Sequence, residues 1–351
     1  MTAPLNFTRG TLGGLDWNTG NDLETLMKLI QANTISEDLV TEQATRIVAT
    51  MLNFALPQAD FPSVEEVQKI VVREPESKSF IRRAGAESIT LLKNKNGTLP
   101  LQERDQLFGL FGANAGNLDA GPVSVLNPLD YAGETWPSHL ASGGGGSSAP
   151  NPYIVSPLDA MTQRISDGAE FDITYILADN YTLSPPPMSN PNLPLTWADP
   201  SLIGYASKSD TCLVFLNAYS KEGADRLTLR DETGDELVGN VADHCADTIV
   251  IMSTAGVRLV DAWIDHPNVT AVLVTAPLGQ ESGNAIVDVL FGDVNPSGRL
   301  PYTIARDESD YNGEICQCCE CEYTEGLYID YRHFDRDEIE PRYEFGFGLC
   351  K

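Results

Sequence analysis

The chain has 351 residues, which is long enough for a full hydrophobic core and for two domains or one large one. It carries 50 Asp and Glu residues against 23 Lys and Arg residues, a formal net charge of −27. This charge disfavours nucleic acid and anionic membrane surfaces as partners and leaves neutral ligands open. No stretch is long and apolar enough to cross a bilayer.

Cysteines and glycosylation sequons favour an oxidising, secretory route. The chain has seven cysteines, and acceptor sequons lie at Asn6, Asn96, Asn180 and Asn268. The opening residues, "MTAPLNFTRGTLGGLDW", have no basic start followed by an apolar core, so they show no signal peptide. We therefore expect either a cytosolic protein or a chain whose true beginning is missing.

Helical periodicity dominates residues 22–54, where apolar residues recur at helical spacing. Ser36 is the expected N-cap of the second helix, because two acidic residues follow it in the first turn. We expect residues 1–55 to form a helical segment and residues 56–85 to form a linker with a short helix, since prolines interrupt the periodicity there.

Apolar runs rich in β-formers alternate with helical patterns through residues 86–310. This pattern predicts an α/β domain with a mostly parallel sheet sandwiched by helices, and residues 311–351 are expected to add loops and short strands. The expected strands are "SITLLKN", "QLFGLFG", "FDITYIL", "TCLVFLNA", "DTIVIMST" and "VTAVLVTA". Helices are expected over 156–165, 235–245, 257–266 and 282–292.

Glycine and cysteine clusters suggest two kinds of site. The "GGGGSS" stretch lacks the preceding strand and following helix of a phosphate-binding loop, so we do not expect a nucleotide cofactor. Four cysteines, Cys316, Cys318, Cys319 and Cys321, are too tightly spaced for a usual zinc site, and a local disulfide is the better interpretation. Cys212 and Cys245 could form another disulfide, and Cys350 is the expected free thiol because seven is odd. We expect neither a metal nor a cofactor.

Serine hydrolase chemistry is not predicted. No GxSxG motif occurs, and Ser282 in "GQESGNA" is best explained as a helix cap. The remaining candidate is Glu222, in a charged loop that directly follows the apolar run "TCLVFLNA". By composition alone this glutamate is either a solvated surface acid or a functional carboxylate at a strand end.

Several long motifs carry a resemblance to a known family. "SITLLKNKNGTLPL", "FLNAYSKEGADRLTL", "LGQESGNAIVDVLFGDVNPSGRLPYTI", "RDESDYN" and "TEGLYIDYRHFDRDEIEPRYEFGFGL" together resemble the fungal β-glucosidases of glycoside hydrolase family 3. The resemblance implies an active site shared by a (β/α) barrel-like domain and an α/β sandwich domain. It assigns Glu222 as the acid/base and residues 1–55 as a remnant of the barrel. It also implies disulfides Cys316–Cys321 and Cys212–Cys245, and a fibronectin-III-like domain after Cys350 that this chain lacks.

The motif that carries the nucleophile in the family is not found in this sequence. Asp16 and Trp17 in "GGLDWNTG" match the segment that follows the nucleophile in the family. We therefore expect an N-terminally truncated chain that supplies only the acid/base of a retaining mechanism, acting on terminal non-reducing β-D-glucosyl residues. The expected partner is a β-glucoside or oligosaccharide, and a homo-oligomer is possible. The alternatives are an inactive carbohydrate-binding remnant and a flavodoxin-like nucleotide binder.

Overall fold

The chain divides into two units, Met1–Arg73 and Glu74–Lys351. The computed structural model describes residues 7–16, 23–54, 62–67, 69–117, 133, 135–144, 151–178, 181–184, 201–223, 225–313, 315 and 321–349. The division falls inside the expected linker of residues 56–85. No helix in these described ranges is long and apolar enough to span a membrane.

Four helices form the described part of the first unit: α1 (Phe7–Leu12), α2 (Leu23–Gln31), α3 (Glu37–Asn53) and α4 (Val64–Val67). Ser36 caps α3, as expected, because its Oγ accepts a hydrogen bond from the N–H of Leu39 at 3.2 Å. The buried amide of Gln43 donates to the carbonyls of Thr11 and Leu15 at 3.1 Å each. This side chain therefore joins α3 to the end of α1.

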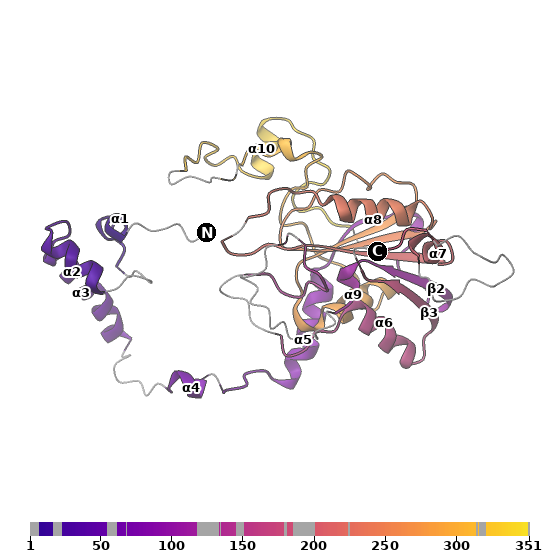
Figure 1. Ribbon diagram of the computed structural model, residues 1–351, viewed down its shortest axis with the longest axis horizontal. Coiled ribbons are helices and arrows are strands. Elements are labelled where there is room, and N and C mark those ends of the chain that lie inside the picture. Colours follow the sequence, from indigo (N-terminus) through magenta and orange to yellow (C-terminus); the bar gives the residue numbers. More distant parts are fainter. Residues whose placement is uncertain are drawn as a thin grey trace. The chain divides into compact units, whose positions relative to one another are not determined.

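A six-stranded sheet forms the centre of the second unit (Figure 1). Its strands are β1 (Thr90–Asn94), β2 (Arg104–Phe111), β3 (Glu170–Ile176), β4 (Thr211–Ala218), β5 (Thr248–Thr254) and β6 (Val269–Thr275). Their order is β1-β6-β5-β4-β2-β3, and only the edge strand β1 runs antiparallel to its neighbour. The prediction of a mostly parallel sheet is confirmed.

Helices cover both faces of this sheet, which explains why every residue of β4, β5 and β6 is buried. On one face Leu213 and Ile249 pack with residues of α5 (Pro75–Ser88), α6 (Pro157–Ser166) and α9 (Ser282–Phe291). On the other face Val214 and Val250 pack with α7 (Leu202–Ala206) and α8 (Glu232–Ala242). Figure 1 shows α8 on the side of the sheet opposite to α5, α6 and α9. Helix α10 (Tyr331–Arg336) and the 3-10 helices Lys95–Gly97, Ala113–Ala115, Gly279–Glu281 and Glu308–Asp310 (η5) complete the described helices.

Helix α5 belongs to the sheet-containing unit. The guanidinium of Arg82 binds both carboxylate oxygens of Asp288 on α9 at 2.6 Å. Gly85 also approaches α9 closely, since a Cβ on it would lie 3.1 Å from the Cβ of Ala285. These contacts dock α5 on the sheet domain, although part of it lies in the expected linker.

The helix expected over 257–266 does not form, and this prediction is wrong. Residues 257–260 have no regular secondary structure and residues 261–265 form turns. Polar contacts with residues distant in the sequence hold this segment: Arg258 is buried against Asp231 and Asp235, and Trp263 Nε1 donates to Asp235 at 2.8 Å. Arg342 also binds Asp261. Helical periodicity in the sequence could not reveal these long-range partners.

Candidate active site

The strand order places a topological switch point between β2 and β4. The chain leaves β2 toward β3 on one side and later returns to β4 on the other side, so the loops after β2 and β4 diverge. Ligands of open α/β sheets bind in the crevice that such divergence leaves at the carboxyl ends of the strands. A small pocket lies here, lined by residues after β2, such as Gly112 and Asn114, and by Asn217 and Leu216 of β4.

Two buried amides shape this crevice. Asn114 donates from Nδ2 to the carbonyl of Leu216 at 2.8 Å and accepts from the N–H of Leu140 at 2.8 Å. Asn217 accepts from the N–H of Trp136 at 2.7 Å and donates to the carbonyl of the same residue at 2.8 Å. The loop of residues 135–140 is therefore held over the carboxyl ends of β2 and β4.

Glu222 lies four residues beyond the end of β4 and is exposed. Its loop is paired at the start with residues of the glycine-rich stretch. The N–H of Glu222 donates to the carbonyl of Gly144 at 3.2 Å, and the N–H of Gly144 donates to the carbonyl of Ser220 at 3.1 Å. Gly223 has a φ of +79°, a left-handed conformation that glycine adopts without strain. The glycine-rich stretch thus supports a carboxylate loop, and no phosphate cradle is needed to explain Gly144.

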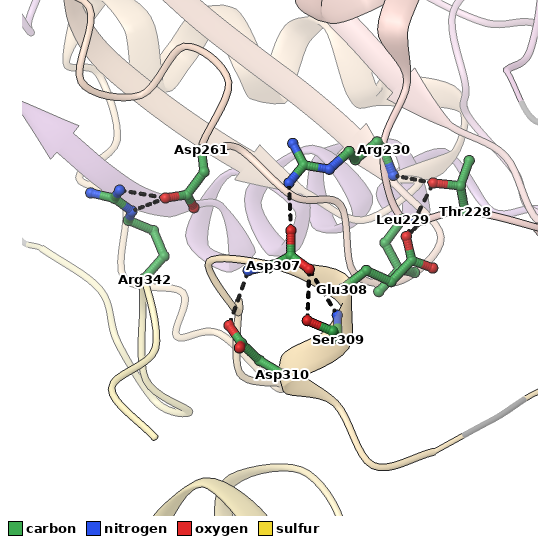
Figure 2. Close-up of polar contacts among 9 residues, drawn as sticks. All are labelled: Thr228, Leu229, Arg230, Asp261, Asp307, Glu308, Ser309, Asp310 and Arg342. Carbon is green, nitrogen blue, oxygen red and sulfur yellow. Dashed lines mark hydrogen bonds and ion pairs between the residues drawn. The ribbon is translucent and has the colours of Figure 1, made fainter. Parts of the chain in front are cut away.

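The other leg of the Glu222 loop is tied to η5 (Figure 2). The carboxylate of Glu308 accepts from Thr228 Oγ1 at 3.1 Å and from the N–H of Leu229 at 3.2 Å. Arg230 pairs with Asp307 at 3.1 Å. The pKa of Asp307 lies below its usual range. The largest cause is the hydrogen bond from the backbone N–H of Ser309, and the Ser309 hydroxyl and the Arg230 guanidinium lower this pKa further. Both legs of the loop are therefore tethered.

Arg226 does not pair with Asp225, in contrast to what neighbouring opposite charges suggest. Between these two described residues the structure has no ion pair, and Arg226 donates instead to the carbonyl of Val257. The arginine therefore ties the loop to the segment after β5, because a backbone carbonyl there is within reach and the exposed Asp225 gains little from pairing.

The capping role predicted for Ser282 is wrong. Ser282 is the first residue of α9, Glu281 is the N-cap, and Ser282 Oγ lies 2.5 Å from Nε2 of the buried His139. His139 Nδ1 faces the carbonyl of Asn114 at 2.8 Å, so Nδ1 carries the proton and Nε2 accepts from the serine. Burial lowers the pKa of His139 to about 4. Ser282 is 1% exposed, so this neutral pair is closed to a substrate.

Asp16 is bound in a forked ion pair in the first unit. Arg46 donates from Nε and Nη2 to the two carboxylate oxygens at 2.8 and 2.7 Å. The hydrogen bonds from Arg46 lower the pKa of Asp16 below its ordinary value. Asp16 is thus an ionised carboxylate whose two oxygens are already occupied. Trp17 lies outside the described residues.

The remaining candidates divide between described and undescribed residues. Cys212 and Cys245 form a disulfide with Cα atoms 6.3 Å apart, and Cys321 is disulfide-bonded. Asn96 is exposed, whereas the side chain of Asn268 donates to the carbonyl of Ala242 at 2.8 Å. Within the described ranges no group of three or more His, Cys, Asp or Glu residues could hold a metal ion. Asn6, Asn180, Cys316, Cys318, Cys319 and Cys350 lie outside the described residues.

Known proteins are similar to this chain in sequence and in fold. Residues 89–349 match the glycosyl hydrolase family 3 C-terminal domain. The chain is 52% identical to the probable β-glucosidase N of Emericella nidulans over 100% of this chain and 55% of that protein, and 43% identical to the probable β-glucosidase D of Aspergillus niger over 95% of this chain and 43% of that protein.

Solved structures agree with this assignment. A β-glucosidase from Chaetomella raphigera superposes with a TM-score of 0.79 at 29% identity, over 98% of this chain and 48% of that one. The β-D-glucoside glucohydrolase of Trichoderma reesei gives 0.76 at 30% identity, over 98% and 47%. The chain thus spans about half the length of the relatives it matches. The chain belongs to glycosyl hydrolase family 3, and its sheet-containing unit carries that family's C-terminal domain.

Proposed function

We propose that this chain supplies the acid/base half of a retaining β-glucosidase, with Glu222 as the acid/base. The observation that carries the proposal is the place of Glu222: an exposed carboxylate in a loop tethered on both legs, at the carboxyl end of β4 beside the switch point. The named relatives are probable β-glucosidases, which supports a β-glucoside or oligosaccharide as the substrate.

Retaining glycosidases use two carboxylates, generally about 5–5.5 Å apart. In this scheme Glu222 first gives a proton to the leaving oxygen, while the other carboxylate attacks the anomeric carbon. The same glutamate then takes a proton from the water that hydrolyses the glycosyl intermediate. A tethered loop favours this work, because a misplaced proton donor loses much of its effect.

We propose that the nucleophile lies outside these 351 residues. Asp16 is the candidate that the sequence offers near the expected position, but Arg46 occupies both of its oxygens. Each oxygen keeps a second lone pair, but the ion pair holds both oxygens against Arg46, which makes Asp16 a structural contact within the first unit. The 351-residue chain alone is therefore expected to show little or no hydrolysis.

A chimera tests the role of Glu222 directly. The chain would replace the matched 55% of β-glucosidase N, so that the remainder of that relative is present. Glu222→Gln should lower kcat/KM for methyl β-glucoside by about 10²–10⁴, because its leaving group needs a proton. The loss in kcat/KM, which reports only the steps up to formation of the glycosyl intermediate, should be much smaller with dinitrophenyl β-glucoside, whose leaving group departs as an anion. Equal losses on both substrates, or no loss, would refute the assignment.

A secretory route accords with the Cys212–Cys245 disulfide, since such bonds persist in oxidising compartments. We include secretion of the whole protein in the proposal. Mass spectrometry of the product from a fungal host would test it: a glycan on Asn96 is expected, because this sequon is exposed, whereas an intracellular product without glycans would contradict the proposal.

A further inference from the structure

Asn217 lies next to last in β4, five residues before Glu222, and its side chain binds a separate segment of the chain. This amide is 5% exposed and makes three hydrogen bonds. Its Oδ1 accepts from the N–H of Trp136 at 2.7 Å, and its Nδ2 donates to the carbonyls of Trp136 at 2.8 Å and Ser138 at 3.2 Å. Both halves of one buried amide thus fix the backbone at Trp136 to the carboxyl end of β4.

The indole of Trp136 packs on the ring of Tyr219, which lies three residues before Glu222. The two ring centroids are 5.2 Å apart, with 39° between the ring planes. Together with Leu140 these side chains form a small buried cluster of their own. The position of Trp136, which Asn217 fixes, therefore sets the position of the Tyr219 ring.

Tyr219 is in contact with Gly144, whose missing side chain makes room for the phenol. The backbone of Gly144 in turn pairs with both neighbours of Lys221: its N–H donates to the carbonyl of Ser220, and its carbonyl accepts from the N–H of Glu222. An unbroken series of contacts therefore leads from the Asn217 amide to the backbone of Glu222.

We propose that Asn217 and Trp136 are positioning residues for the acid/base, and that they act through the place of Glu222. This inference rests on the proposed function of Glu222 and extends it to two further residues. A general acid must lie within hydrogen-bond reach of the leaving oxygen, and a displacement of about 1 Å costs on the order of 10² in rate. The Glu222 loop has no regular secondary structure to supply this precision, so the buried contacts beside it must do so.

The catalytic test uses Asn217→Ala in the chimera with β-glucosidase N. This change removes all three hydrogen bonds, so kcat/KM for methyl β-glucoside should fall by about 10–100-fold. The fall with dinitrophenyl β-glucoside should be much smaller, because its leaving group departs without a proton. A role in folding alone would reduce the amount of active enzyme, which lowers both values by one factor and leaves their ratio unchanged.

Asn94→Ala is the matched control. Asn94 makes the same pair of bonds to one backbone unit, because its Oδ1 accepts from the N–H of Leu99 at 3.0 Å and its Nδ2 donates to the carbonyl of Leu99 at 3.1 Å. It lies at the opposite end of the sheet, where β1 pairs with Ala271 near the start of β6. The ratio of the two kcat/KM values in Asn94→Ala should equal that of the wild type.

Trp136 is tested by two variants that both keep the backbone bonds to Asn217. Trp136→Leu removes the ring and should lower the ratio of the two kcat/KM values about tenfold. Trp136→Phe keeps an aromatic ring against Tyr219 and should stay within about threefold of the wild type. Ratios equal to that of the wild type in both Asn217→Ala and Trp136→Leu would overturn the proposal.

Amide hydrogen exchange on the 351-residue chain gives a readout that does not depend on catalysis. Exchange at Gly144 and Glu222 should become about 5–10-fold faster in Asn217→Ala and should not change in Asn94→Ala. Unchanged exchange in Asn217→Ala would overturn the proposal even if Glu222→Gln confirms the acid/base. Faster exchange, combined with a Glu222→Gln chimera that shows no leaving-group dependence, would refute the catalytic assignment and leave the coupling of Asn217 to this loop standing.

Discussion

Gly144 lies so close to Tyr219 that a Cβ on the glycine would meet the phenol oxygen at 2.0 Å. The same Cβ would lie 2.6 Å from the Cβ of Lys221. The side chains just before Glu222 therefore pack against bare backbone of the glycine-rich stretch. This contact places a loop without regular secondary structure at a fixed distance from the carboxyl end of β4.

Gly144→Ala should consequently destabilise the fold and displace the Glu222 loop. We expect the free energy of unfolding to fall by about 1–3 kcal/mol, the usual cost of forcing a methyl group into a packed site. Urea denaturation measures this change. Gly143→Ala is the control, because a Cβ there meets nothing within 4 Å, and it should leave the free energy of unfolding unchanged. Equal stability of the two variants would show that the close contact does not constrain the loop.

Glu308 should control the mobility of residues 225–230, the segment of the loop that follows Glu222. Its carboxylate accepts from Thr228 Oγ1 and the Leu229 N–H, so Glu308→Ala removes both bonds at once. Amide hydrogen exchange over 225–230 should become about 5–10-fold faster, which corresponds to the roughly 1 kcal/mol of one net hydrogen bond. Glu344→Ala, another exposed acid near the C-terminus, is the control and should not alter this exchange. Unchanged exchange in Glu308→Ala would mean that Arg230 and Asp307 suffice to hold the leg.

Stability should fall as the pH drops through the range set by His139. Burial lowers the pKa of this side chain to about 4 in the folded state, whereas the unfolded chain has the ordinary value of about 6.5. Between these values the unfolded chain binds more protons, so stability is full above about pH 6.5 and is lost toward pH 4, by at most about 3 kcal/mol. Urea denaturation of the wild type and His139→Gln at several pH values measures the difference.

His139→Gln should be less stable than the wild type at pH 7, because the bond to Ser282 is altered, yet should lose less stability on acidification. His244→Gln is the control, since His244 is exposed, and it should follow the wild type. If His139→Gln and wild type lose stability in parallel between pH 6.5 and 4, the buried imidazole is not the titrating group.

Local patterns predicted most of the sheet but few of the contacts that shape the site. Apolar runs marked β4 and its neighbours because burial on both faces leaves an uninterrupted hydrophobic stretch. The same run contains Asn217, the polar residue whose amide fixes the loop at Trp136, and a polar residue ending a buried strand was a usable signal.

The tethers of Glu222 had no such signal. Glu308 is 79 residues from Leu229 in the chain, and Gly144 lies in a low-complexity stretch whose composition suggests only flexibility. The wrong prediction of a helix over 257–266 has the same cause. The conformation of this segment depends on contacts with Asp235 and Arg342, which are distant in the sequence. The position of Glu222 after an apolar run could suggest a functional carboxylate, whereas the residues that hold its loop in place could be found only from the structure.

Arg258 provides the last prediction, because it is a buried cation with incomplete pairing. Its side chain is 1% exposed and lies 3.1 Å from Asp235, while Nε and Nη1 have no hydrogen-bond partner among the described residues. Burial raises the pKa of Asp235 even though Arg258 opposes that shift. Arg258→Leu should therefore leave a half-buried carboxylate without its cation and lower the free energy of unfolding by about 3–5 kcal/mol at pH 7.

The deficit of Arg258→Leu should shrink on acidification. A carboxyl group whose folded-state pKa is raised destabilises the fold where the unfolded chain would ionise, so the penalty grows as the pH rises from the unfolded pKa of about 3.9 to the folded-state pKa, is full above it and is absent below the unfolded value. Adding Asp235→Asn removes the charge and keeps an acceptor for Trp263 Nε1, which donates to Asp235 at 2.8 Å. The double variant should recover most of the stability at pH 7. A double variant as unstable as Arg258→Leu would show that the arginine acts through its packing and not through its charge.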